Sequence, residues 1–215
     1  MKIIDAKTIE AAYERIKRYI NKTPLVSNNN INNQFGAQIY FKLENEQITG
    51  SFKIRGALNK ILQLNEDQKE KGIVAYSSGN HAQAVSYASH ILKIRSTIVM
   101  PKDAPKIKIN NTKKYGSEII LYDRENEDRE KIAIDLAKKK DRTLIRPFND
   151  EDIIIGQGTA GLEITNELLK KKIYPNIYLC CCSGGGLIAG TSTYLKSFFS
   201  NLLIYSVEPQ YYDDM

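Results

Sequence analysis

The sequence lacks the features that mark secreted or membrane proteins. No apolar run approaches the roughly 18 residues that a membrane-spanning helix needs. The first residues, from Met1 to Asp5, lack the apolar stretch and the small-residue cleavage site of a secretory signal. We therefore expect a cytoplasmic protein with no membrane partner.

Cysteine is also scarce, and its arrangement excludes the common roles of clustered cysteines. Cys180, Cys181 and Cys182 are consecutive, so they cannot pair as an ordinary disulfide. The run lacks the spacing of metal ligands, and free thiols fit a reducing compartment. We expect a buried strand in which the small thiols pack as apolar side chains. Reactive thiol chemistry is the alternative.

The composition fits a folded protein without a nucleic-acid partner. Of the 215 residues, 42% are hydrophobic, which is enough for a packed core in one large domain or two small ones. The net charge of +6 comes largely from lysine runs such as 138–140 and 170–172. These runs lie near the ends of predicted helices, where cations suit the helix dipole. Aromatic residues do not interleave with them as in a nucleic-acid platform.

Short β-rich runs alternate with amphipathic segments, a pattern typical of parallel sheets covered by helices. The predicted strands are Gln38–Leu43, Ile73–Ser77, Thr97–Met100, Glu118–Tyr122, Thr143–Ile145, Ile177–Cys182 and Leu203–Val207. The predicted helices are Ser51–Leu64, His81–Leu92, Ala104–Tyr115, Asn126–Lys139, Gln157–Lys171 and Leu187–Lys196. The sequence therefore predicts an α/β fold, in which ligands bind beyond the carboxyl ends of the strands.

Lys53 stands in the first of three loops that contain candidate functional residues. Gly50 ends the loop, and Ser51 is a good N-cap for the helix that follows. Lys53 then falls in the first helical turn, where the positive end of the dipole lowers the pKa of an amine. A neutral amine can attack an aldehyde to form a Schiff base. A solvated surface lysine is the alternative, and it describes most lysines.

The second loop, Ser77-Ser78-Gly79-Asn80-His81, joins a predicted strand to a predicted helix. It offers hydroxyls, an amide and free backbone N–H groups at a helix N-terminus, which together suit a carboxylate. A capped turn with no ligand is the alternative.

The third loop, Ser183-Gly184-Gly185-Gly186-Leu187, also joins a strand to a helix. Three glycines let the backbone approach a ligand closely, and successive N–H groups can wrap a phosphate. The segment is not a Walker loop, because no Gly-Lys-Ser/Thr follows. Together the three loops supply an amine for an aldehyde, a carboxylate site and a phosphate site. This combination suggests pyridoxal phosphate acting on an amino acid.

The same loops resemble those of the fold-type II threonine dehydratases and serine racemases. The similar segments are Ser51 to Ala57, Ser77 to Gln83, Gly156 to Thr159 and Ser183 to Gly190, in the family's order. The resemblance implies that Lys53 bonds the cofactor aldehyde, that Phe52 packs by its ring and that Asn80 bonds its 3-oxygen. It also implies phosphate contacts by Ser183, Gly184, Gly185, Gly186 and Leu187, and substrate contacts by Ser77, Ser78, Asn80, His81 and Arg129. The family's phosphate loop commonly begins with Gly, where this chain has Ser183.

A divalent cation site is a further implication of the resemblance. The family binds such a cation through a stretch similar to the segment from Glu208 to Asp214. The ligands would be Glu208, Tyr212 and Asp214, and hard oxygen ligands suit Mg²⁺ or Ca²⁺. An acidic surface loop is the alternative.

The resemblance implies a tryptophan synthase β-like architecture with two open, mostly parallel twisted sheets. We expect a small domain at 49–148 and a large domain at 1–48 and 149–215, with the cofactor between them. Family members continue well beyond residue 215 and thereby supply a residue opposite the pyridine nitrogen. We therefore expect an incomplete large domain, an unprotected sheet edge and little activity from these 215 residues.

The expected reaction is the conversion of L-threonine or L-serine to a 2-keto acid and ammonia by a lyase that is dimeric when complete. Lys53 would remove the α-proton. Serine racemisation shares this first half and needs an acid on the opposite face, for which Ser78 is the candidate. A non-catalytic remnant that binds a partner subunit is the alternative from another class.

Overall fold

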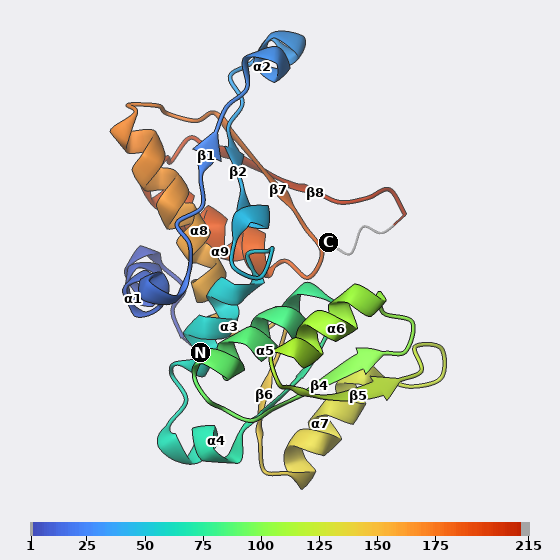
Figure 1. Ribbon diagram of the computed structural model, residues 1–215. Helices are drawn as coiled ribbons and strands as arrows, with labels where there is room; N and C mark the ends of the chain where they lie inside the picture. Colours follow the sequence, from blue (N-terminus) through green and yellow to red (C-terminus); the bar gives the residue numbers. More distant parts are fainter. Residues whose placement is uncertain (1, 212–215) are drawn as a thin grey trace.

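The computed structural model describes residues 2–211, which form helices around small sheets (Figure 1). The strands are β1 (Leu25–Val26), β2 (Phe41–Lys42), β3 (Ile73–Tyr76), β4 (Ser96–Pro101), β5 (Glu118–Tyr122), β6 (Thr143–Ile145), β7 (Ile177–Cys181) and β8 (Leu203–Val207). The helices are α1 (Ala6–Ile16), α2 (Asn29–Phe35), α3 (Lys53–Ile61), α4 (Glu66–Lys71), α5 (Asn80–Ile91), α6 (Lys106–Lys114), α7 (Arg129–Lys139), α8 (Glu151–Lys170) and α9 (Gly186–Phe198), with 3-10 turns at Lys17–Tyr19 and Glu44–Glu46. The predicted α/β class is confirmed, because helices flank two parallel sheets.

The larger sheet has four parallel strands in the order β5-β4-β3-β6. Every residue of β3 and β4 is buried, because helices cover both faces of the sheet. Successive strand residues point to opposite faces. Ile73 and Ala75 therefore pack with α3 and α5, while Val74 and Tyr76 pack with α7. The loop that follows β3 thus starts from a rigid core.

A second group of elements contains the parallel strands β7 and β8 together with α1, α8 and α9. One face of the two strands packs on the helices, where Tyr178 and Ile204 lie against Leu195. On the other face, Leu179 is 64% exposed and Tyr205 is 50% exposed. The short antiparallel pair β1–β2 completes the upper part of Figure 1.

Helix α8 touches both α3 and α9 through glycine backbone. A Cβ added at Gly156 would lie 2.6 Å from the Cα of Gly56 in α3. A Cβ added at Gly190 in α9 would lie 2.7 Å from the backbone nitrogen of Gly158. Only residues without a side chain allow helices to approach this closely. The start of α3 and the start of α9 are therefore fixed relative to each other through α8.

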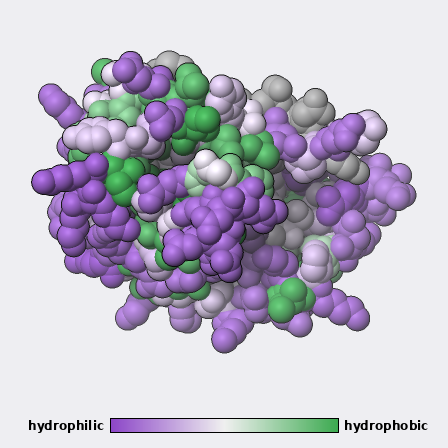
Figure 2. Space-filling model, turned by 90° about the horizontal axis from the view of Figure 1, so that it is seen from above, coloured by the Kyte–Doolittle hydropathy of each residue, from purple (hydrophilic) through white to green (hydrophobic). Residues whose placement is uncertain are grey.

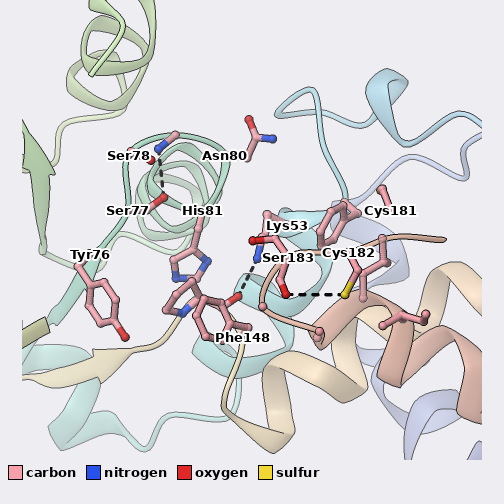
Figure 3. A pocket seen from close by; sticks show the side chains of 18 of the residues that line it. Lys53, Tyr76, Ser77, Ser78, Asn80, His81, Phe148, Cys181, Cys182 and Ser183 are labelled. Carbon is pink, nitrogen blue, oxygen red and sulfur yellow. Dashed lines mark hydrogen bonds between the residues drawn. The ribbon is translucent and has the colours of Figure 1, made fainter. Parts of the chain in front are cut away.

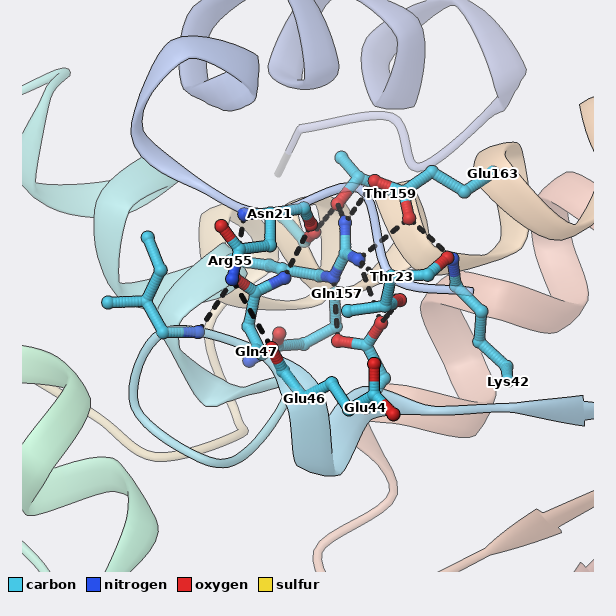
Figure 4. A network of polar contacts seen from close by, with 12 residues as sticks. Asn21, Thr23, Lys42, Glu44, Glu46, Gln47, Arg55, Gln157, Thr159 and Glu163 are labelled. Atoms are coloured by element: carbon cyan, nitrogen blue, oxygen red, sulfur yellow. Dashed lines mark hydrogen bonds and ion pairs between the residues drawn. The ribbon is translucent and has the colours of Figure 1, made fainter. Parts of the chain in front are cut away.

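A buried ion network holds α3 against α8 and the N-terminal segment (Figure 4). Arg55 is fully buried, and its guanidinium donates to Glu44 and Glu163 at 2.8 Å each. Lys42 donates to Glu163 at 2.5 Å. Burial alone would lower the pKa of Arg55, but hydrogen bonds to the two carboxylates hold it above its ordinary value. The guanidinium thus stays charged where an unpaired charge would be strongly destabilising.

Several predicted elements have different ends in the structure. The strand predicted at Gln38–Leu43 pairs only at Phe41–Lys42. Helix α8 begins at Glu151 and not at Gln157, because the Asp150 side chain accepts from two N–H groups of the first turn. The predicted N-cap role of Ser51 is wrong. Phe52 occupies the cap position, and the buried Ser51 hydroxyl has no hydrogen-bond partner among the described residues.

Among residues 2–211, no helix combines the length and the apolar character that a membrane span requires. Hydrophilic side chains cover most of the face shown in Figure 2, and hydrophobic ones gather in patches between them. The four-stranded sheet lies inside the range 49–148 that we assign to a small domain. The domain boundaries themselves stay a prediction.

Candidate active site

The N-termini of α3, α5, α7 and α9 surround one cavity of about 410 Å³ (Figure 3). The cavity lies where β3 and β7 end, the edge at which parallel α/β folds bind ligands. All residues predicted to contact cofactor or substrate line it. The full lining is Phe52, Lys53, Tyr76, Ser77, Ser78, Gly79, Asn80, His81, Arg129, Pro147, Phe148, Cys181, Cys182, Ser183, Gly184, Gly185, Gly186, Leu187 and Ile188.

Lys53 is the first residue of α3, and its amine lies in the cavity wall. The Nζ atom donates to the carbonyl oxygen of Pro147 at 2.8 Å. It lies 5.2 Å from the ring centroid of Phe52 and 6.0 Å from that of Phe148. Burial lowers the pKa of Lys53 from 10.5 to about 8. About a tenth of the amine is therefore neutral, and nucleophilic, at pH 7, far more than for a lysine in water.

The loop after β3 turns tightly into α5. Ser77 Oγ accepts a hydrogen bond from the Gly79 N–H at 3.1 Å. Asn80 begins α5, and its amide oxygen accepts from Lys108 Nζ at 2.6 Å. The Asn80 amide nitrogen is thus the end of that side chain that suits an acceptor on a ligand. The helix N-terminus adds backbone N–H groups that favour an anion.

His81 is buried on the same side of the cavity. Its Nε2 atom lies 3.2 Å from the carbonyl oxygen of Ile145, so Nε2 carries the proton and donates it there. Burial, reinforced by the charge of Lys53, lowers the pKa of His81 to about 3. The ring is therefore neutral, and its Nδ1 atom is a buried acceptor without a partner among the described residues. Such an orphaned acceptor suits a ligand that brings a donor.

The glycine loop after β7 lies directly against Phe148. A Cβ added at Gly184 would lie 2.7 Å from Cε1 of the Phe148 ring, so only glycine fits there. Gly185 has a φ of +74° and caps α9 without a side-chain bond. The first N–H groups of α9 therefore stay available, as an anion site requires.

Arg129 begins α7 at the far side of the cavity. Its guanidinium lies 5.8 Å from the centroid of the Tyr76 ring. No carboxylate of the described residues forms an ion pair with it. No aspartate or glutamate of residues 2–211 lines the cavity either, so Lys53 and Arg129 give this lining a positive character.

Sequence reasoning missed some of the lining residues, chiefly Tyr76, Pro147, Phe148 and the two cysteines. Pro147 and Phe148 follow the predicted strand Thr143–Ile145, so strand-end position was a usable signal for them. The expectation of three buried thiols is wrong in part. Cys180 is buried, but Cys181 is exposed and Cys182 is half-buried, because within residues 2–211 one face of the β7–β8 sheet is left uncovered.

The predicted metal site stays a prediction. Tyr212 and Asp214 lie outside the described residues, and Glu208, which follows β8, does not line the cavity. Among residues 2–211 no group of three or more acidic, histidine or cysteine side chains is placed to hold a metal ion.

Comparison with known proteins identifies the family of this chain. Residues 16–215 match the family of pyridoxal-phosphate dependent enzymes. The chain belongs to this family. It is 42% identical over 202 residues to a serine racemase of Schizosaccharomyces pombe, covering 94% of this chain and 61% of that protein. It is 43% identical over 201 residues to an L-threo-3-hydroxyaspartate ammonia-lyase of Saccharomyces cerevisiae, covering 93% and 60%.

The solved structures agree with this membership. A maize serine racemase superposes with a TM-score of 0.91 at 37% identity, over 97% of this chain and 62% of that one. The chain thus spans about three fifths of the length of the relatives that it matches.

The residues of the cavity fit the family's cofactor. The amine of Lys53 suits an aldehyde, and the rings of Phe52 and Phe148 in the cavity lining offer flat apolar surfaces to a heterocycle. The side-chain-free loop at the start of α9 suits a phosphate. These three features lie in one cavity, so the same group can reach all of them.

Proposed function

We propose that this chain converts L-threonine or L-serine to a 2-keto acid and ammonia with the help of pyridoxal phosphate. The observation that carries the proposal is the buried Lys53 amine, with a pKa of about 8, in the same cavity as the glycine loop of α9. When bound, the cofactor supplies an aldehyde that bonds amines and a ring that stabilises negative charge on the substrate's α-carbon.

The chain's own residues bind the phosphate, bind the substrate carboxylate and move the proton. Ser183 to Gly186 and the start of α9 hold the phosphate. Ser77 to His81 and the start of α5 bind and orient the substrate carboxylate. Lys53, as a neutral amine, takes the α-proton at its Nζ atom. The ring of His81 stays neutral and accepts a hydrogen bond at Nδ1.

Arg129 extends the range of substrates to be assayed. A guanidinium that lies over the Tyr76 ring and forms no ion pair with residues 2–211 suits a second carboxylate on the substrate. The 43% identical relative acts on L-threo-3-hydroxyaspartate, which has such a group. This amino acid therefore belongs in the assay beside L-threonine and L-serine.

Covalent labelling tests the proposal directly. Purified protein mixed with pyridoxal phosphate should gain absorbance in the near-visible range, and borohydride should fix one cofactor per chain to Lys53. Mass spectrometry locates the adduct. The variant Lys53→Ala should lose it, whereas Lys60→Ala, which changes another lysine of α3, should keep it. An adduct on a different lysine of the folded protein contradicts the proposal.

Serine racemisation is the second candidate, and Ser78 supports it. Ser78 lines the same cavity as Lys53, and its hydroxyl can hold a second proton. If it protonates the face opposite Lys53, Ser78→Ala should lower D-serine formation by about 100-fold or more and keto-acid formation far less. One incubation with L-serine yields both products, so their ratio is an internal control. An unchanged ratio excludes this role of Ser78.

A further inference from the structure

The three consecutive cysteines at the end of β7 have different surroundings. Cys180 is 4% exposed, and its Sγ atom lies 3.5 Å from the carbonyl oxygen of Cys181. Cys181 is exposed and Cys182 is half-buried, and both line the cavity (Figure 3). The run thus places two thiols beside the glycine loop and one thiol in the core.

The electrostatics of the cavity favour the thiolate form, which is the nucleophile. Lys53 on α3 and Arg129 on α7 line the same cavity, and the N-terminus of α9 lies a few residues after Cys182. His81 on α5 is neutral, and the described part of the chain contributes no carboxylate to the cavity lining. The pKa of Cys181 lies below its ordinary value, chiefly because of a hydrogen bond with the Cys180 side chain.

We propose that Cys181, with Cys182 beside it, is a thiol-modification site that takes small anionic disulfides. The Cys181 thiolate attacks one sulfur of the disulfide and forms a mixed disulfide with it. The original S–S bond breaks, and the second sulfur leaves with the electron pair as a free thiolate. The protein thiol is oxidised and the small disulfide is reduced, so no further reactant is needed.

Because the thiol lies beside the glycine loop, its modification should affect anion binding there. The attached group occupies the cavity next to Ser183 to Gly186, where the proposed function places a phosphate. Modification and anion binding therefore exclude each other. This consequence rests on the proposed phosphate loop, but it does not depend on the chemistry of Lys53.

Ellman's reagent, a disulfide with two carboxylates, tests the inference on cofactor-free protein. The unfolded chain should release three coloured thiolates, one for each cysteine. The folded chain should show a fast phase that mass mapping places on Cys181. With inorganic phosphate at about ten times its Kd, the rate of this phase should fall about tenfold.

Matched variants separate the three positions. Cys181→Ser should remove the fast phase, whereas Cys180→Ala should keep its amplitude, because Cys180 does not line the cavity. Lys53→Ala, which abolishes the proposed cofactor bond and removes one cation from the cavity, should slow the fast phase but leave it on Cys181, so failure of the two proposals can be told apart. A fast phase on Cys180, no fast phase in folded protein, or a rate that phosphate leaves unchanged overturns the inference.

Discussion

At the scale of single residues, the surroundings of Lys53 make its amine a better nucleophile than that of an exposed lysine. Its amine lies 5.2 Å and 6.0 Å from the ring centroids of Phe52 and Phe148 and donates to the Pro147 carbonyl. Neither a ring nor a neutral carbonyl offsets the loss of water as a carboxylate would, so burial lowers the pKa.

This shift predicts a pH dependence that requires no cofactor. Labelling of amines by trinitrobenzenesulfonate, read residue by residue by mass spectrometry, should show a midpoint for Lys53 near pH 8. In an unfolded peptide, which serves as the reference, the lysine midpoint lies at about pH 10.4. The unfolded chain binds more protons at this residue between the two values, so stability should rise with pH through that window. Lys53→Met should remove that rise, and a midpoint for Lys53 near that of the peptide contradicts the buried setting.

The sequence predicted which loops meet in the cavity better than it predicted which side chains enter it. The loops containing Lys53, Ser77 and Gly184 could be found because ligands gather where parallel strands end and helices begin. Tyr76 and Cys181 were missed, because strand alternation decides only the face of the sheet. Whether a side chain on that face meets a helix, a cavity or solvent depends on packing from distant parts of the chain.

At the scale of elements, the network around Arg55 ties α3 to α8 and thereby positions Lys53. Arg55 has Glu44 on one side and Glu163 on the other, and Glu163 also binds Lys42. The buried guanidinium of Arg55 and the half-buried amine of Lys42 thus both depend on Glu163, which is itself 1% exposed.

Glu163→Gln should therefore lower the free energy of unfolding by about 3 kcal/mol or more, because it leaves buried positive charge without its partner. Urea denaturation followed by circular dichroism measures the change. Glu167→Gln is the matched control in the same helix. It removes a surface pair with Lys22 and should cost less than about 1 kcal/mol. Equal effects of the two changes would mean that the buried network contributes no more than a surface pair.

Two helices that begin with capping boxes were not predicted from the sequence. Helix α1 was not predicted, although Asp5 and Thr8 form a capping box and Ile9, Ala12 and Ile16 have helical spacing. Helix α4 likewise begins with a capping box of Asn65 and Gln68. These signals were present and local. By contrast, the contact of Gly56 with Gly156 joins residues far apart in the chain, and no local pattern reveals it.

At the scale of the whole molecule, the sheet of β7 and β8 stands out, because among residues 2–211 these strands pair only with each other. Ile177, Leu179, Leu203, Tyr205 and Val207 alternate along the strands on one face, and each is at least 50% exposed. An open sheet edge beside exposed apolar side chains favours association with other chains.

We expect the 215-residue chain to self-associate through this face at micromolar concentration. Tyr205→Lys combined with Leu179→Lys should shift sedimentation toward the monomer, because the charges would be buried in the contact. Ile107→Lys, which changes an apolar residue of α6 that is 67% exposed, is the control and should leave association unchanged. Equal association of all three proteins contradicts this assignment. The low turnover expected of this chain stays a prediction.

The glycine contacts of α8 also have a mechanical consequence. Between α3, α8 and α9 the backbones touch at Gly56, Gly156, Gly158 and Gly190, so these contacts cannot adjust by rotation of a side chain. The position of Lys53 relative to the glycine loop therefore depends on main-chain contacts as well as on the side-chain network around Arg55. A side chain added at Gly156 or Gly190 would force the helices apart and so separate the amine from the loop.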